Sequence, residues 1–294
     1  GRAAGDGLIL HERLWGSPLV VDENGGVGGD AISGYNTGNK FLGEGFFTLT
    51  PWASSSRGTF TATLGASTER NRTEENRIHG QGFSSPDLHD VGNATNIISY
   101  RGDRGANNLV SYFARTTLNV ADRYLLSASL RSDGSSKFGE NNRYGVFPAA
   151  SLGWVLSQEP WLRPLSRLGS IKLRASYGVT GNQGIGNNSF RATDSSSNYG
   201  KDPGITPANL ANPNLKWEQT KEQDYGFDWM VLDGRISLVG DYYKKNTSNL
   251  LVSRPVTGTS GFTSFTDNVG SIENHGVEFE ATADIVPRNG SGGF

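Results

Sequence analysis

The fold is decided by residues 112–131, which read YFARTTLNV, then ADR, then YLLSASLR. In the first run every second residue from Tyr112 to Val120 is uncharged, whereas Arg115 lies among the residues between them. The alternation resumes at Tyr124, after the short polar turn at 121–123. A side-chain period of two is typical of a β-strand, so two such runs around a short turn predict a β-hairpin.

The same alternation recurs in six further segments, at 60–66, 146–156, 171–179, 225–229, 236–242 and 277–285. Across all eight segments, one face carries no charged side chain. The opposite face carries Arg115, Arg131, Lys172, Arg174, Asp228, Asp241, Glu278, Glu280 and Asp284. This asymmetry predicts an antiparallel sheet with one face against apolar surroundings and the other against water.

The composition excludes several classes of protein. The 294 residues contain 27 Lys and Arg against 29 Asp and Glu, a balance that argues against an electrostatic nucleic-acid binder. The absence of cysteine excludes a disulfide scaffold and a thiolate zinc site. No uninterrupted apolar run exceeds the four residues Trp229–Leu232, which excludes a transmembrane helix of about 20 residues but leaves a transmembrane β-barrel open.

The predicted connections alternate between short and long. Short turns lie at 121–123 and 232–234, and long loops rich in Gly, Asn, Ser and Thr are expected at about Glu69–Asn107, Gly181–Leu215 and Thr247–Asn268. Outer-membrane barrels have short periplasmic turns and long extracellular loops. The pattern therefore favours a barrel over an ordinary compact domain, in which loops of this length are uncommon.

Aromatic residues lie where the two girdles of a membrane barrel would be. Tyr124 and Trp229 lie beside short turns, whereas Tyr112, Tyr177 and Tyr242 lie near the long loops. Strands of about 9–11 residues with aromatic side chains at both ends match the thickness of a bilayer. A soluble antiparallel sandwich also alternates in this way and stays open as an alternative.

Seven motifs follow one another along the chain: SYFAR at 111–115, YLL continuing into LRSDGSSKFG at 124–139, FPAASLGW at 147–154, KLRASYGVTGNQ at 172–183, LANPNLKWE at 210–218, DYYKK at 241–245 and NVGSIENHGVE at 268–278. In their order and spacing, these motifs resemble the SusC/RagA family of TonB-linked outer-membrane transporters. The resemblance holds from about Thr59 to Ile285 and is weak over residues 1–40.

The resemblance implies a 22-stranded barrel that is filled by an N-terminal plug and imports nutrients under TonB drive. It also implies a SusD-like surface lipoprotein that acts as a lid and helps to capture glycan oligosaccharides or peptides. The expected location is the outer membrane of a Gram-negative, Bacteroidetes-like bacterium, with outer-membrane lipid around the barrel. No nucleic acid is an expected partner.

Residues 1–294 are accordingly expected to form part of a TonB-dependent receptor β-barrel. We expect an all-β, partial antiparallel transmembrane barrel of about nine strands, with residues 1–40 as a loop or strand region. Neither a plug domain nor a TonB box is recognised in the sequence. We therefore interpret the sequence as an interior slice of the barrel.

The sequence predicts no catalytic residue, no cofactor and no metal ligand set. The four histidines show no paired zinc spacing, and residues 22–26 lack the ligand order of an EF-hand, although a calcium site in the loops stays open. The candidates for facing substrate are the loop aromatics Phe190, Tyr199 and Trp217, because aromatic rings stack on sugars. A role in loop packing or in the aromatic girdle is the alternative for each.

The predicted function is active import of nutrients through the outer membrane, without enzymatic activity. Two alternatives stay open: a soluble or surface β-sandwich that binds carbohydrate, and a passive porin. The sandwich would pack its apolar residues against a second sheet, whereas a barrel would leave them exposed.

Overall fold

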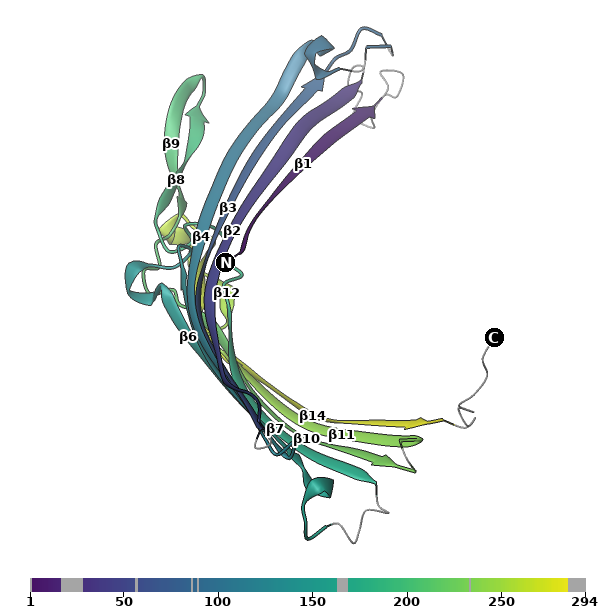
Figure 1. The fold of residues 1–294 in the computed structure, drawn as a ribbon. Coiled ribbons are helices and arrows are strands. Elements are labelled where there is room, and N and C mark those ends of the chain that lie inside the picture. The colour runs from purple at the N-terminus through teal and green to yellow at the C-terminus, as the bar shows by residue number, and fades with distance from the viewer. Residues whose placement is uncertain are drawn as a thin grey trace, which may run out of the picture. The chain divides into compact units, whose positions relative to one another are not determined.

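The structure is a computed structural model that describes residues 2–16, 29–55, 58–85, 87–88, 90–162, 169–232 and 234–284. Within these ranges the protein consists of β-strands and four short 3-10 helices (Figure 1). The strands are β1 (Arg2–Gly16), β2 (Asp30–Ser55), β3 (Gly58–Gln81), β4 (Asn96–Val120), β5 (Tyr124–Ser135), β6 (Tyr144–Val155), β7 (Ser170–Asn182), β8 (Thr193–Tyr199), β9 (Asp202–Asn209), β10 (Glu218–Val231), β11 (Ile236–Ser248), β12 (Leu251–Pro255), β13 (Ser264–Asn268) and β14 (Ser271–Ala283). The helices are η1 (Val91–Asn93), η2 (Glu140–Asn142), η3 (Leu156–Gln158) and η5 (Gly258–Ser260).

Ten strands form the main sheet, in the order β1-β2-β3-β4-β5-β6-β7-β10-β11-β14. The pairs β1–β2, β5–β6, β6–β7, β7–β10, β10–β11 and β11–β14 are antiparallel. Neighbours in the chain are thus neighbours in the sheet, except where the two-stranded sheets β8–β9 and β12–β13 are inserted. The expected all-β antiparallel architecture is confirmed, and the strand number is close to the expected nine.

The chain divides into two compact units. Unit 1 comprises Gly1–Glu44 and Ser67–Leu109, and unit 2 comprises Gly45–Ala66 and Val110–Phe294. In unit 1, β1 pairs with β2 from Arg2 opposite Glu44 to Gly16 opposite Asp30. The weakly matched N-terminal region is therefore largely strand where the structure describes it.

The prediction of a long loop at Glu69–Asn107 is wrong. Strand β3 continues to Gln81 and β4 begins at Asn96, so the connection is only residues 82–95. Residues 69–77 read ERNRTEENR and are polar on both faces, so they show no apolar period. A strand can be held by backbone hydrogen bonds alone, even where its side chains show no apolar period. The hydrophobic pattern of the sequence does not reveal such a strand.

In unit 2 the pairing register places the apolar residues of successive strands opposite one another. One row across six strands consists of Leu126, Leu152, Ala175, Tyr225, Tyr242 and Val277. Exposed large side chains on this face include Tyr112, Leu126, Leu130, Leu152, Leu173, Tyr177, Tyr225, Phe227, Tyr242, Val277 and Phe279. We call this exposed apolar face of unit 2 the outer face.

The exposure of the outer face separates the two fold alternatives. Phe279 is 67% exposed and Leu126 is 42% exposed, so neither packs against a second layer. A soluble sandwich would bury such residues between two sheets. The outer face has instead the character of the lipid-facing surface of a membrane barrel.

The short turns have the backbone geometry that a tight hairpin requires. Ala121 and Asp122 both adopt left-handed φ angles, 53° and 54°, which is the signature of a type I′ turn. The Arg123 N–H donates to the carbonyl of Val120 at 3.0 Å.

The predictions of the two other long loops are partly wrong, because residues 181–215 contain the hairpin β8–β9 and residues 247–268 contain the hairpin β12–β13.

Candidate functional site

The face of unit 2 opposite the outer face, which we call the inner face, carries the polar side chains of the same strands. One row across it consists of Leu125, Gly153, Arg174, Gly226, Asp241 and Glu278. The side-chain period of two produces this separation, because each polar residue lies between two outer-face residues of its own strand. The inner face is therefore the candidate surface for a hydrophilic ligand.

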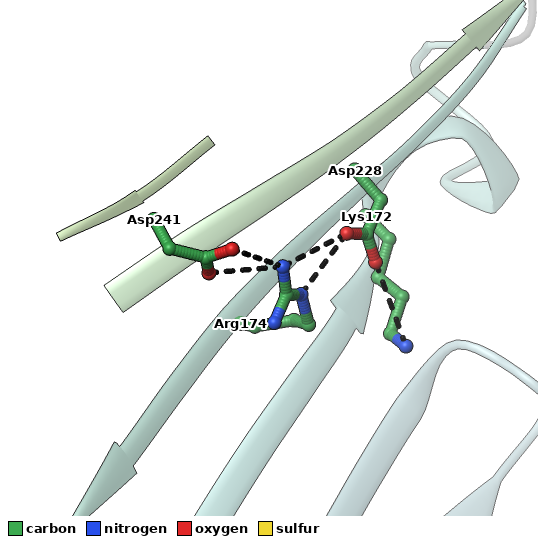
Figure 2. A network of polar contacts seen from close by, with 4 residues as sticks. All are labelled: Lys172, Arg174, Asp228 and Asp241. Atoms are coloured by element: carbon green, nitrogen blue, oxygen red, sulfur yellow. Dashed lines mark hydrogen bonds and ion pairs between the residues drawn. The ribbon is translucent and has the colours of Figure 1, made fainter. Parts of the chain in front are cut away.

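Four charged residues of the inner face form one network (Figure 2). Arg174 of β7 lies between two carboxylates, with Nη2 3.0 Å from Oδ1 of Asp228 and 3.0 Å from Oδ1 of Asp241. Its Nε also donates to Asp228 Oδ1 at 3.1 Å, and Lys172 Nζ lies 3.8 Å from Asp228 Oδ2. Two cations and two anions balance, so the network is neutral as a whole.

Gly226 of β10 makes the bridge from Arg174 to Asp241 possible. It lies directly opposite Arg174 of β7 on one side and directly opposite Asp241 of β11 on the other. A Cβ at this position would collide with Asp241 Oδ1 and lie 2.9 Å from Arg174 Nη2. The missing side chain thus leaves the space in which an arginine of one strand reaches an aspartate two strands away.

Beside the network, the inner face has two adjoining hollows, of about 470 and 320 Å³. They share Ser127 of β5, Ser151 of β6 and Ser176 of β7, and we call the two hollows together the serine trough. The hydroxyls of Ser127 and Ser151 lie 2.7 Å apart and share a hydrogen bond. Small side chains form the floor, so the surface is lower here than at the charged residues beside it.

At the loop end of unit 2 an aromatic cluster is the best-buried part of the described structure. Trp217 is 5% exposed, and its ring centroid lies 5.1 Å from that of Phe138 and 5.4 Å from that of Phe147. Its Nε1 donates to the carbonyl of Arg143 at 3.0 Å. Leu215 beside it is fully buried. The cluster holds together three stretches that the sequence analysis singled out as separate motifs.

A second junction ties the inserted hairpin β12–β13 to the segment before β10. Asn212 Nδ2 donates to the carbonyl of Thr266 and to Asp267 Oδ1, both at 3.0 Å. Asn268 accepts from the Lys216 N–H at 2.9 Å and donates to the Lys216 carbonyl at 2.8 Å. Asparagine suits this position because its amide both donates and accepts.

At the end of the strands away from the loop end, a carboxylate in the connection after β6 forms hydrogen bonds with side chains of β5 and β6. Glu159 is 6% exposed, and its Oε1 accepts hydrogen bonds from Tyr124 Oη at 2.6 Å and from Trp154 Nε1 at 3.0 Å. Arg123 Nη1 lies 3.9 Å from Oε2. Chiefly through the Tyr124 hydrogen bond, these groups hold the pKa of Glu159 below its usual value of 4.5.

The structure does not gather the three predicted substrate-facing aromatics into one site. Tyr199, at the end of β8, is 88% exposed, whereas Trp217 belongs to the buried aromatic cluster. Phe190 is half-buried, and the guanidinium of Arg191 stacks over its ring at 4.9 Å. A role in binding substrate stays a prediction for all three, and the packing of Trp217 matches the alternative of loop packing.

Among the described residues, no group of three or more His, Asp or Glu side chains is placed to hold a metal ion. The loop at 22–26, considered above for calcium, lies outside the described residues. Within the same described part of the chain, no helix has the length and apolar character needed to cross a membrane.

Sequence reasoning identified the charged residues of the inner face but missed their arrangement. Alternation showed that Arg174, Asp228 and Asp241 share a face, but only the strand register shows that they meet over Gly226. It also missed the serine trough, because serines on a water-facing strand carry no hydrophobic signal. A cluster of small residues at every second position of three strands is the pattern that could have revealed it.

Comparisons with known proteins agree with the geometry. The family described as "TonB dependent receptor-like, beta-barrel" matches residues 16–293. The chain is 34% identical over 254 residues to TonB-dependent receptor P39 of Formosa agariphila, covering 85% of this chain and 24% of the relative. It is 37% identical over 192 residues to TonB-dependent receptor SusC of Bacteroides thetaiotaomicron, covering 61% of this chain and 19% of that protein.

Solved structures show the same fold. A structure described as the RagAB peptide transporter superposes with a TM-score of 0.85 at 23% identity, over 97% of this chain and 32% of that chain. The chain spans about a quarter of the length of curated relatives that it matches. Taken with the exposed outer face and the polar inner face, the family match establishes that this chain belongs to the TonB-dependent receptor β-barrel family.

Proposed function

We propose that this chain forms part of the wall of an outer-membrane transporter of the SusC/RagA type, which actively imports oligosaccharides or peptides. The outer face contacts lipid and the inner face lines a hydrated passage. The proposed location is the outer membrane of a Gram-negative bacterium related to the Bacteroidetes in which the matched receptors occur.

The observation that carries the proposal is the separation of the two faces. In the parts of β5, β6, β7, β10, β11 and β14 nearer the short turns, every second residue contributes to an exposed apolar surface, while the residues between them form charged and hydroxyl-rich rows. A charged side chain at the middle of a bilayer costs about 2–4 kcal/mol. A protein in water would have no reason to keep one face so apolar and so exposed.

We further propose that residues 1–294 act together with parts of the longer protein. A plug with a TonB box, supplied elsewhere in that protein, would couple the barrel to TonB. A SusD-like surface lipoprotein would cover the loop end of unit 2. The strongly exposed β8–β9 hairpin, with Tyr199 and Ile205 accessible to solvent, offers that partner a contact surface.

The proposal assigns no catalytic residue and no cofactor to the chain. Transport along a wall requires hydrogen bonds and exclusion by size, whereas catalysis requires a nucleophile with a base or a matched acid and base. The charged groups of the network form ion pairs with one another, which suits a structural role in the wall.

The test is deletion of the full-length gene in its host, followed by growth on single glycans and on peptide mixtures as sole nutrients. We expect growth to fail on one of the two classes and to fail equally when TonB is removed. Growth that needs the gene but not TonB would indicate a passive porin. Unchanged growth and uptake on every source would overturn the proposal.

A further inference from the structure

We propose that three arginines of unit 1, Arg70 and Arg72 of β3 and Arg104 of β4, bind the phosphate groups of lipid A, the phosphorylated glycolipid of the outer leaflet. We call these three residues the arginine patch. The inference rests on the proposed function, because it requires a barrel in an outer membrane with its loop end outside. It goes beyond that function, because the ligand is a lipid of the surrounding membrane and not an imported nutrient.

The two arginines of β3 lie on the same side of the strand as its apolar residues. From residue 64 to residue 72 the even-numbered side chains are exposed, and the odd-numbered ones between them are half-buried. The exposed series is Leu64, Ala66, Thr68, Arg70 and Arg72. Because a side-chain period of two keeps such a series on one side of a strand, the side that is apolar in unit 2 carries arginine in unit 1.

The neighbouring strands β2 and β4 make the same change from apolar to polar toward the loop end. On β2, Phe41 is 52% exposed and is followed at every second position by Asn39 and Thr37. On β4 the corresponding series is Tyr112, Val110, Asn108, Ala106 and Arg104. In an outer-membrane barrel this change marks the edge of the apolar band that contacts lipid chains. The first charged residues beyond this edge are those of the arginine patch.

The patch borders a hollow of about 510 Å³, a volume in the usual range of small-ligand sites. Three neighbouring strands form its lining, which consists of Thr37, Asn39, Arg72, Thr73, Glu74, Arg104, Gly105 and Ala106. All of these residues lie in unit 1, so the hollow belongs to one compact unit. Hydroxyl, amide and guanidinium groups thus line one hollow, which suits a phosphorylated sugar.

The charge on this side of unit 1 favours an anion. Arg104 donates to Glu74 Oε1 from Nε at 3.2 Å and from Nη2 at 2.9 Å, so the carboxylate in the hollow is already neutralised. Arg70 and Arg72 remain as excess positive charge among the described side chains on this side of β2, β3 and β4 in unit 1. A guanidinium group matches phosphate especially well, because its planar fork can donate two parallel hydrogen bonds.

The depth of the patch favours a lipid headgroup over a soluble anion. Arg70 lies four residues beyond Ala66, which corresponds to about 13 Å along the strand and about 9 Å across the membrane at a strand tilt of about 45°. The headgroup region extends about 5–8 Å beyond the hydrocarbon core on each side of a bilayer. An arginine side chain is long enough to reach back into this region. The phosphates of lipid A are the anionic groups that lie there in the outer leaflet.

The experiment measures lipid binding to the purified full-length protein in detergent by native mass spectrometry. The probes are diphosphoryl lipid A and the same lipid after enzymatic removal of both phosphates, with inorganic phosphate as a competitor. The test variant is R70Q/R72Q/R104Q. Retained heat-modifiable migration on a gel confirms that each variant is folded.

The matched control, K40Q/R77Q/R101Q, removes the same number of positive charges from the opposite side of β2, β3 and β4. We expect this control to bind diphosphoryl lipid A as well as the unaltered protein does. The test variant should bind it about a hundredfold more weakly, since each arginine beside an anionic headgroup contributes about fivefold. Removal of both phosphates from the lipid should weaken its binding to the unaltered protein to the same extent.

Three outcomes would each overturn the inference: equal affinity of the test variant and the control, equal affinity for the lipid with and without its phosphates, or complete displacement of the lipid by millimolar inorganic phosphate. Lipid binding is measured here without transport. Patch-dependent binding together with a failed growth test would therefore refute nutrient import alone. Normal growth that requires TonB, together with binding that ignores the patch, would refute only the present inference.

Discussion

The side-chain pattern of strand β3 differs between its part in unit 2 and its part in unit 1. The comparison shows which property of a strand the alternation of apolar and polar residues reflects. In unit 2 it alternates Phe60, Ala62 and Leu64 with threonines and a glycine, whereas in unit 1 it continues as ERNRTEENR at 69–77. Both parts are strand. The hydrophobic period therefore reports what surrounds a strand, whereas the strand itself is maintained by backbone pairing.

The polar side chains of unit 1 form ion pairs and hydrogen bonds with one another. Arg104 Nη2 lies 2.9 Å from Glu74 Oε1, and Lys40 Nζ lies 3.0 Å from Glu69 Oε2. Asn71 Nδ2 donates to Glu69 and to Asn107. Pairs of this kind are suited to a wet surface, and in hydrocarbon their desolvation would be expensive.

The largest expected effect comes from placing charged side chains, like those of unit 1, on the outer face of unit 2. In the full-length protein, L126R combined with L173R should cost about 4–8 kcal/mol, because each arginine near the bilayer midplane costs about 2–4 kcal/mol. We expect assembly to be blocked, as measured by heat-modifiable migration in the outer-membrane fraction. F279R alone should have a smaller effect of the same kind.

The matched controls for this prediction lie on the inner face and in unit 1. S127R, S176R and T282R should assemble normally, and so should T68R in the polar part of β3. Equal tolerance at Leu126 and Ser127 would contradict a lipid-facing outer face.

The second prediction concerns the aromatic cluster. W217A removes the ring that packs on Phe138 and Phe147, and a buried aromatic truncated to alanine typically costs about 3–5 kcal/mol. Because the cluster lies at the loop end, we expect faster hydrogen exchange in residues 136–147 and 210–217, with assembly retained. Y199A, at an 88% exposed position, is the control and should leave exchange unchanged.

The third prediction compares one ion pair from each unit. R174A should destabilise the full-length barrel by about 1–2 kcal/mol, since Arg174 is only 31% exposed and bonds two carboxylates. R104A should cost less than about 0.5 kcal/mol, because Arg104 is 83% exposed. Guanidinium unfolding in lipid vesicles measures both.

A double-mutant cycle of R174A with D241N isolates the contact across Gly226. G226A should reproduce the loss, because a Cβ there displaces Asp241 from Arg174. A stability of G226A equal to that of the unaltered protein would show that the bridge contributes nothing.

The smallest expected effect is a pH dependence at the end of the strands opposite the loops. Because the pKa of Glu159 is lowered on folding, its contribution to stability is complete above the unfolded pKa of about 4.5 and is lost as the pH falls through the folded pKa. E159Q should remove this loss of stability below pH 4.5. Above pH 4.5, the free energy of unfolding of E159Q should vary with pH in parallel with that of the unaltered protein. Identical profiles for both proteins would contradict the role given to the Tyr124 hydrogen bond.

Most of unit 2 was predictable from the sequence, and most of unit 1 was not. The hairpin at 112–131 was visible because hydrocarbon on one side and water on the other impose a period of two on the side chains. The continuation of β3 past Glu69 and the hairpins β8–β9 and β12–β13 were not visible, because water on both faces imposes no period. For the same reason the largely exposed strands β8 and β9 looked like a loop.

Which side chains share a face follows from the order of the amino acids alone, since it depends only on the parity of their positions. Which of them meet depends on the folded sheet: Arg174 reaches Asp241 over Gly226, and Trp217 packs against Phe138 and Phe147. The physical reason is that these contacts depend on the register between strands. Register is set by hydrogen bonds between segments far apart in the chain, and a local pattern does not contain it.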